Sequence, residues 1–113
     1  MAAEARLTSE FWVGAYLARL RREAIPAFVT ARGDATAGAV LVKVSTLDGA
    51  ARVFQRSFDL GTNARRWVVL AQGADADVED AIARQRSFDP DLWVIEVEDR
   101  AGRHLLDEDG LSD

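Results

Sequence analysis

A tight turn between two strand-like runs constrains the fold of this sequence more than any other feature. Residues 40–44 read Val-Leu-Val-Lys-Val, a β-branched run typical of a strand, and the dipeptide Asp48-Gly49 follows shortly after it. Asp-Gly between two such runs is the strongest short-range signal for a β-hairpin. We therefore expect residues 52–58 to return as the second strand of an antiparallel pair.

Helices and further strands are predicted on both sides of this hairpin. An apolar stripe with a helical period predicts a helix over residues 9–24, with Thr8 as its N-cap and Pro26 beyond its end. A second helix is expected to be capped by Asp75 or Asp77. The remaining strands are expected over residues 27–32, 67–70 and 92–98. The order α-β-β-β-β-α-β indicates a single α+β domain, with an antiparallel meander sheet and one strand–helix–strand unit.

The expected core gathers on the central strands. Residues 67–70 are apolar without interruption, which is typical of a strand buried on both faces. Along residues 92–98, Trp93, Ile95 and Val97 point to one side, which faces the core. Glu96 and Glu98 point to the other side. The side chains expected to be buried are Leu17, Leu20, Val42, Val44, Val53, Trp67, Val69, Ile82, Trp93, Ile95 and Val97. The domain spans the whole chain, and residues 1–6 and 107–113 are expected to fray.

Composition excludes several classes of site. The chain has 113 residues, of which 49% are hydrophobic and 29% charged, and these values are ordinary for one globular domain. It has no cysteine, so it forms neither disulfides nor a thiolate metal site nor a cysteine nucleophile. No apolar run approaches the roughly 20 residues that a membrane-spanning helix needs, and the N-terminus has no apolar leader. We therefore expect a cytoplasmic protein without a membrane partner.

Charge is divided between the two ends of the chain. Residues 1–66 carry ten Arg or Lys against six Asp or Glu, a balance of +4. Residues 67–113 carry four against thirteen, a balance of −9, and the two sum to the net charge of −5. Such asymmetry gives a molecule an electric dipole, which influences the partners that it binds rather than its fold. Two copies can pair through opposite charges, so a homodimer is one expected assembly.

The hairpin carries the best candidate binding site. With a two-residue turn at Asp48-Gly49, Lys43 lies opposite Phe54, and alternation sorts the side chains between two faces. The face expected to be exposed holds Lys43, Arg52, Phe54 and Arg56. Cations among aromatic rings are what single-stranded nucleic acid binds, with phosphates on Arg and bases on the rings. In the structural alternative the first helix partly covers this face, and the Arg stems lie on the aromatic rings with their charged heads in solvent. The acidic pI of about 4.8 favours that alternative.

Carboxylates at the ends of elements are the other candidate for chemistry. Glu96, Glu98 and Asp99 end the last predicted strand, and such clusters hold Mg²⁺ or act as acid and base. A helix, a meander, a helix and a strand is also the layout of a large nuclease superfamily. The predicted strands at 52–58 and 67–70 lack its acid and its acid-x-Lys pair, and likeness of fold alone does not carry function. We assign no catalytic residue, no metal ligand and no cofactor.

Several stretches of the chain resemble a known family. They are Phe11-Trp12-Val13, Arg65-Arg66-Trp67 and residues 93–100. The sequence resembles a family of short cytoplasmic proteins from alphaproteobacteria that is catalogued as a domain of unknown function. The resemblance covers nearly the whole chain. The resemblance implies a single domain in the cytoplasm. It implies no activity, cofactor or binding site.

The sequence therefore favours a non-enzymatic module that binds a macromolecular partner, with a protein as the expected partner. Two alternatives stay open. The first is a single-stranded nucleic-acid binder that uses the hairpin face. The second is a metal-dependent enzyme built on carboxylates.

Overall fold

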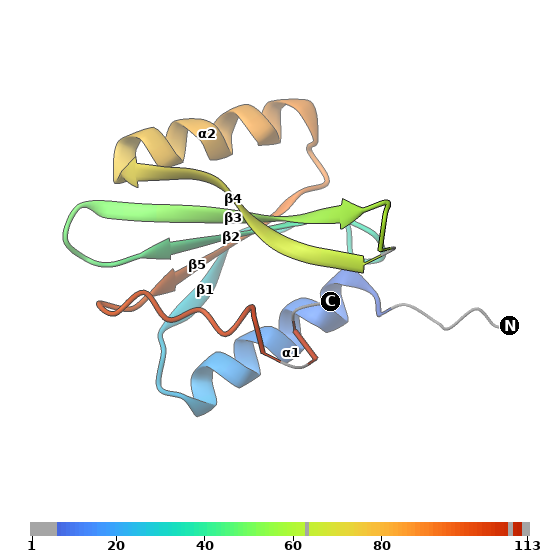
Figure 1. Ribbon diagram of the computed structural model, residues 1–113, viewed down its shortest axis with the longest axis horizontal. Coiled ribbons are helices and arrows are strands. Elements are labelled where there is room, and N and C mark those ends of the chain that lie inside the picture. The colour runs from blue at the N-terminus through green and yellow to red at the C-terminus, as the bar shows by residue number, and fades with distance from the viewer. Residues whose placement is uncertain (1–6, 63, 109, 112–113) are drawn as a thin grey trace, which may run out of the picture.

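The computed structural model describes residues 7–62, 64–108 and 110–111. Within these residues, two helices and five strands follow one another in the predicted order, α-β-β-β-β-α-β, so the chain is an α+β domain (Figure 1). The elements are α1 (Ser9–Arg22), β1 (Ala27–Ala31), β2 (Val40–Ser45), β3 (Ala50–Asp59), β4 (Ala64–Ala74), α2 (Asp75–Phe88) and β5 (Trp93–Glu98). Neither helix of the described part is long and apolar enough to cross a membrane.

The five strands form one mixed sheet in the order β1-β5-β2-β3-β4. β2, β3 and β4 make the predicted antiparallel meander, while β5 inserts on the other side of β2, parallel to β2 and antiparallel to β1. β3 and β2 lie between β4 and β5, so the strand–helix–strand unit spans the sheet instead of joining neighbouring strands. Figure 1 shows α2 on one face of the sheet and α1 on the other. We call these the α2 face and the α1 face.

α1 forms where the sequence predicts it and ends slightly earlier. The Thr8 side chain accepts a hydrogen bond from the Phe11 backbone N–H, 3.2 Å away, which caps the first turn. Ala24 adopts a left-handed conformation (φ 58°), and this turn ends the helix at Arg22 instead of at residue 24. The buried residues of α1 are Trp12, Val13, Tyr16 and Leu20. They lie on one side of the helix, which therefore packs on the sheet along that side.

The hairpin between β2 and β3 forms, but its predicted register is wrong by one residue. Lys43 lies opposite Val53, whereas a two-residue turn would place it opposite Phe54. The turn is longer because Leu47 as well as Gly49 adopts a left-handed conformation (φ 63° and 92°). A shift of one residue moves a side chain to the other face of the sheet. Lys43 therefore lies on the α2 face, whereas Phe54 lies on the α1 face.

β4 is an edge strand, which corrects the prediction that residues 67–70 are buried on both faces. The insertion of β5 beyond β2 leaves β4 outermost, with β3 as its neighbour in the sheet. Val69 is 42% exposed, and Trp67 and Leu17 are only partly buried. The other expected core residues are buried, namely Leu20, Val42, Val44, Val53, Ile82, Trp93, Ile95 and Val97.

The chain after β5 packs on the domain, although we expected it to fray from residue 107. Residues 103–108, 110 and 111, which we call the C-terminal strap, have no regular helix or strand. Leu106 and Leu111 are nonetheless buried in the apolar cluster between α1 and the sheet. Residues 1–6, 109, 112 and 113, which we also expected to fray, lie outside the described residues.

Candidate functional site

Three of the four residues predicted to form a binding face lie together on the α1 face. Arg52, Phe54 and Arg56 alternate along β3. Phe54 is only 6% exposed, and the guanidinium of Arg52 lies over its ring, 5.2 Å from the ring centroid. The fourth residue, Lys43, lies on the α2 face. The structure thus separates the predicted set and packs its three remaining members between the sheet and the elements that cover it.

Arg56 is enclosed by two tryptophan rings. Its guanidinium carbon lies 4.7 Å from the ring centroid of Trp67 and 5.2 Å from that of Trp12. Trp12 in turn stacks on Tyr16 of α1, with 4.9 Å between the centroids. A guanidinium packs well on aromatic faces because it is flat, delocalised and weakly hydrated. This layer agrees with the structural alternative in that Arg side chains pack on aromatic rings beneath a helix. It differs in that the charged head of Arg56, and not only its stem, lies against the rings.

The C-terminal strap closes the rest of the α1 face. The Tyr16 hydroxyl donates a hydrogen bond to the His104 carbonyl oxygen at 2.8 Å, and the Trp67 Nε1–H donates to the Leu111 carbonyl oxygen at 3.0 Å. The His104 ring packs on Phe54, with 4.7 Å between the centroids. Figure 1 shows the strap, in orange-red, passing between the sheet and α1. A partner-binding role for the residues beneath it stays a prediction.

His104 is kept neutral by its surroundings in the strap. Its Nδ1 accepts a hydrogen bond from the Leu106 backbone N–H at 3.0 Å, which requires that Nδ1 carry no proton. Burial lowers the pKa of the imidazole and outweighs the opposite effect of Asp107, and the charge of Arg52 lowers the pKa further. At neutral pH His104 therefore serves as a hydrogen-bonded packing residue.

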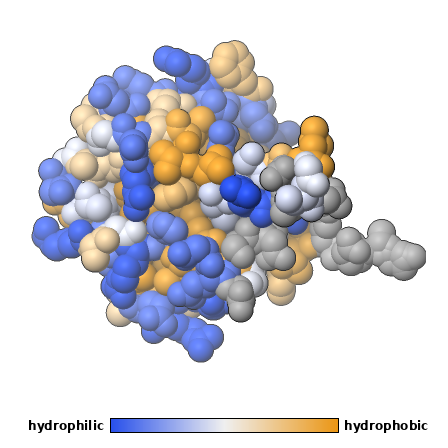
Figure 2. All heavy atoms as spheres, in the orientation of Figure 1, coloured by the Kyte–Doolittle hydropathy of each residue, from blue (hydrophilic) through white to orange (hydrophobic). Residues whose placement is uncertain are grey.

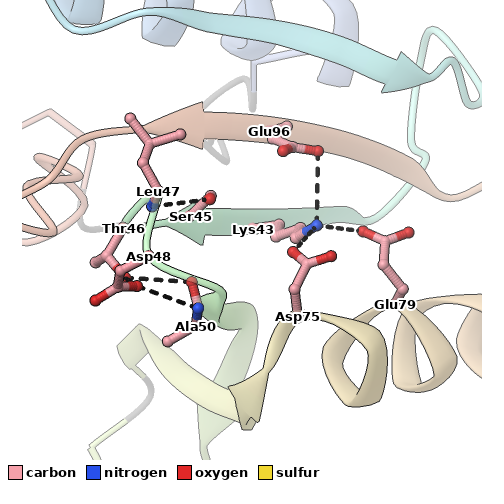
Figure 3. Close-up of polar contacts among 9 residues, drawn as sticks. All are labelled: Lys43, Ser45, Thr46, Leu47, Asp48, Ala50, Asp75, Glu79 and Glu96. Atoms are coloured by element: carbon pink, nitrogen blue, oxygen red, sulfur yellow. Dashed lines mark hydrogen bonds and ion pairs between the residues drawn. The ribbon is translucent and has the colours of Figure 1, made fainter.

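Lys43 lies on the α2 face, where three carboxylates surround its ammonium group. Only 3% of the residue is exposed. Its Nζ lies 2.7 Å from Asp75 Oδ1, 2.5 Å from Glu79 Oε2 and 3.8 Å from Glu96 Oε1 (Figure 3). We call these four residues the Lys43 cluster. Burial by itself lowers the pKa of Lys43, but the hydrogen bonds to Asp75 and Glu79 outweigh burial and raise the pKa above its ordinary value.

The Lys43 cluster ties the start of α2 to the middle of the sheet. Asp75 and Glu79 lie about one helical turn apart, so both carboxylates share one flank of α2. The prediction that Asp75 or Asp77 is the N-cap of α2 is wrong. The helix begins at Asp75, and Ala74 occupies the cap position without a side-chain hydrogen bond. Burial raises the pKa of Glu96, the charge of Lys43 opposes this, and neighbouring carboxylates raise the pKa further.

The sequence contained a signal for this cluster that the predicted register concealed. Lys43 is the only lysine of the chain, and Asp75 and Glu79 have the spacing that presents two carboxylates on one side of a helix. Of the carboxylates considered for metal binding, Glu96 joins Lys43, and Asp99 pairs with Arg103 at 2.9 Å. Among the residues that the structure describes, no three His, Asp or Glu side chains are grouped so as to hold a metal ion.

The outer side of β4 is the longer of the two sheet edges, with 11 residues against 5 in β1. Its centre is apolar, because Val69 is 42% exposed and Val68 and Leu70 are half-buried. Figure 2 shows hydrophobic side chains gathered at the middle of this side of the molecule, where Figure 1 places β4. We call residues 65–72 and their outward main chain the β4 edge. An edge strand presents N–H and C=O groups that can pair with a further strand.

Comparisons with known proteins identify a family. Residues 7–107 match the family described as a protein of unknown function, DUF1491. The chain is similar to the 1.87 Å crystal structure of a DUF1491 family protein from Caulobacter crescentus CB15, with a TM-score of 0.82 and 39% identity over 91% of this chain and 97% of that chain. An NMR structure of a DUF1491 family protein from the same bacterium gives a TM-score of 0.79 and 38% identity over 93% of this chain and 96% of that one.

A third structure agrees with these two. The solution structure of the protein Atu0922 from A. tumefaciens has a TM-score of 0.71 and 28% identity, over 83% of this chain and 86% of that chain. No curated protein matches the sequence. The resemblance to an alphaproteobacterial family of unknown function is thus confirmed. The chain belongs to the DUF1491 family.

Proposed function

We propose that the protein is a non-enzymatic binding module that takes up a strand of a protein partner along the β4 edge. One observation carries this proposal: among the described residues, an 11-residue strand with an apolar centre has a neighbouring strand on one side only. Proteins usually shorten, charge or cover such an edge, because its main chain pairs readily with another chain. An edge with an exposed valine at its centre suits strand addition, in which the main chain supplies affinity and the side chains supply specificity.

The surroundings of the β4 edge favour a protein partner over a nucleic acid. α2, which lies over β3 and β4, carries four acidic residues against two arginines. This net charge of −2 offsets the two arginines of the β4 edge, Arg65 and Arg66, so the edge lacks the excess of positive charge on which nucleic-acid binding depends. An apolar strand of a protein needs no such excess. We place this module in the cytoplasm, in line with the composition of the chain.

The two alternatives draw less support from the site. A nucleic-acid platform needs guanidinium groups that are open to phosphates, and those of Arg52 and Arg56 lie on aromatic rings of the α1 face. A carboxylate-based enzyme needs acids that are available to a metal or a substrate. Asp75, Glu79 and Glu96 instead surround the ammonium group of Lys43.

Matched variants at the two sheet edges test the proposal. Val69→Lys places a charge at the centre of the β4 edge, and Val29→Lys places the same charge on β1, where Val29 is 37% exposed. The chain is used to capture proteins from an alphaproteobacterial lysate, and each captured protein is then purified and titrated against all three chains. We expect a true partner to bind wild type and Val29→Lys equally and Val69→Lys at least about tenfold more weakly. Equal binding to all three chains would contradict the proposal.

A further inference from the structure

The geometry points to a second copy of this chain as the partner that pairs with the β4 edge. This inference rests on the proposed function and names the partner. The two copies meet with their β4 strands antiparallel about a twofold axis, so that two five-stranded sheets become one continuous sheet.

Pairing of the β4 strands also brings the α2 helices together. α2 begins directly where β4 ends and packs back over β3 and β4 (Figure 1). A twofold axis perpendicular to the sheet keeps both α2 helices on the same face, antiparallel and next to each other. The contact between them is made by the flank of α2 that faces the outer side of β4.

Helical periodicity identifies this flank. Asp75 and Glu79 reach Lys43 in β2, so their flank of α2 faces the centre of the sheet. At about 100° per residue, the opposite flank is formed by Asp77, Ala81, Arg84 and Phe88. We call these four residues the outer flank of α2. Ala81 is half-buried, and the other three are exposed.

The outer flank of α2 is complementary to itself. Asp77 and Arg84 lie about two turns apart, with the small side chain of Ala81 between them. With the twofold axis at Ala81, Asp77 of each copy lies beside Arg84 of the other, which forms two ion pairs. Within the described part of the chain, neither Asp77 nor Arg84 has an ion-pair partner. Phe88, which is 79% exposed, lies against the second copy in this arrangement.

The β4 strand fits the same axis. β4 has one extra residue, Leu70, opposite the step from Val53 to Phe54 in β3. In an antiparallel pair with its axis between Leu70 and Ala71 the two bulges lie side by side, and residues 67–70 of each copy pair with residues 71–74 of the other. The exposed valine next to the bulge is then buried near the axis, while the ion pairs lie towards the outside. An apolar centre with a polar rim is typical of a protein interface.

Sedimentation of the full chain over a wide concentration range tests the inference with matched variants. Val69→Lys acts near the axis, and Val29→Lys is the control at the other edge of the sheet. Asp77→Arg and Arg84→Asp each place like charges side by side across the axis. The double exchange Asp77→Arg with Arg84→Asp restores opposite charges. Circular dichroism and the melting temperature show that each variant is folded.

We expect wild type and Val29→Lys to dimerise alike, and Val69→Lys to dimerise about a hundredfold more weakly. Each single charge change weakens the dimer about tenfold, and the double exchange returns it to near the wild-type affinity. A dimer that Val69→Lys leaves intact overturns the β4 edge as its interface. If the double exchange does not restore the affinity of the dimer, the contact between the α2 helices is overturned. A chain that is monomeric at every concentration overturns the second copy as the partner, whereas the proposed function is decided separately by the capture experiment.

Discussion

The two faces of the sheet bury cations in different ways. On the α1 face, Arg56 lies between two tryptophan rings, and on the α2 face Lys43 is surrounded by three carboxylates. A guanidinium is flat and weakly hydrated, so it loses little when it is stacked on a ring. An ammonium group is compact and strongly hydrated, so it needs anionic oxygens in place of water. The chemistry of the layer above each face thus matches the cation that is buried there.

The faces also differ in how completely they are covered. α1 and the C-terminal strap together cover the α1 face, which holds the larger apolar cluster. Of the elements that the structure describes, only α2 covers the α2 face, which holds the smaller cluster. Phe28 of β1, next to Glu96 in the sheet, is 46% exposed there. We therefore expect stability to depend mainly on apolar packing at the α1 face and more on charge at the α2 face.

The largest expected effect comes from apolar packing, which a matched pair of isoleucines compares. Ile95 is buried in the cluster of the α1 face, and Ile82 in that of the α2 face. We expect Ile95→Ala to lower the free energy of unfolding by about 4 kcal/mol and Ile82→Ala by about 2 kcal/mol, because the larger cluster leaves the larger unfilled cavity. Urea unfolding followed by circular dichroism measures both losses. Equal losses would show that the two faces are packed alike.

A somewhat smaller effect is expected at Arg56. Arg56→Glu removes the cation from between two aromatic rings and puts a carboxylate against their negative faces. We expect the free energy of unfolding to fall by about 2–3 kcal/mol, and by only about 1 kcal/mol for Arg56→Met, which keeps an unbranched apolar stem. The same urea experiment applies. If Arg56→Glu were as stable as wild type, Arg56 would belong to an exposed face, as the hairpin pattern first predicted.

On the α2 face, the test removes the charge at the centre of the Lys43 cluster. Lys43→Met keeps most of the side-chain volume and leaves three carboxylates without their cation. The side chains of Asp75 and Glu79 are 46% and 51% exposed, so water limits the cost, and we expect a loss of about 1–2 kcal/mol. Added salt should recover part of this loss by screening the carboxylates. If Lys43→Met were more stable than wild type, the free energy lost on desolvating the ammonium group would exceed the free energy gained from its ion pairs.

His104 makes the stability of the α1 face sensitive to acid. Burial lowers the pKa of folded His104 below its ordinary 6.5, so the unfolded chain takes up the proton first as the pH falls. The contribution of neutral His104 to the free energy of unfolding is therefore complete above pH 6.5. It is lost as the pH falls through the lowered pKa, by up to about 1.4 kcal/mol per pH unit. Urea unfolding at a series of pH values measures it. His104→Leu should lack this dependence, and an unchanged profile in that variant would assign the dependence to another group.

Glu96 on the α2 face is expected to change stability with pH in the direction opposite to His104, and this is the smallest of the expected effects. Burial raises the pKa of folded Glu96 above its ordinary 4.5, so the folded chain takes up the proton first as the pH falls. Protonation of Glu96 therefore adds stability as the pH falls through the raised pKa. Glu96→Gln lacks this gain and should lose stability more steeply on acidification than wild type. A shallower loss in the variant would reverse the assigned direction.

The elements that form within a few residues could be read from the sequence. Thr8 caps α1 as predicted, and the turn after β2 forms at the Asp-Gly dipeptide. The left-handed conformation of Leu47 could not be predicted, because leucine has no preference for it. That one residue lengthens the turn and so decides on which face Lys43 lies. The prediction of four binding residues on one face was therefore wrong in its geometry, although the alternation along β3 was right.

The sequence by itself determined the order of the elements, the N-cap of α1, the place of the hairpin turn and the apolar side of each central strand, because these depend on interactions between near neighbours. Only the tertiary structure decided that β5 inserts between β1 and β2, which leaves β4 at the edge with Val69 exposed. It also decided that the C-terminal strap covers the aromatic layer of the α1 face, where Leu111 is buried. These outcomes depend on contacts between residues far apart in the chain, whose free energy is summed over the whole core and leaves no local pattern.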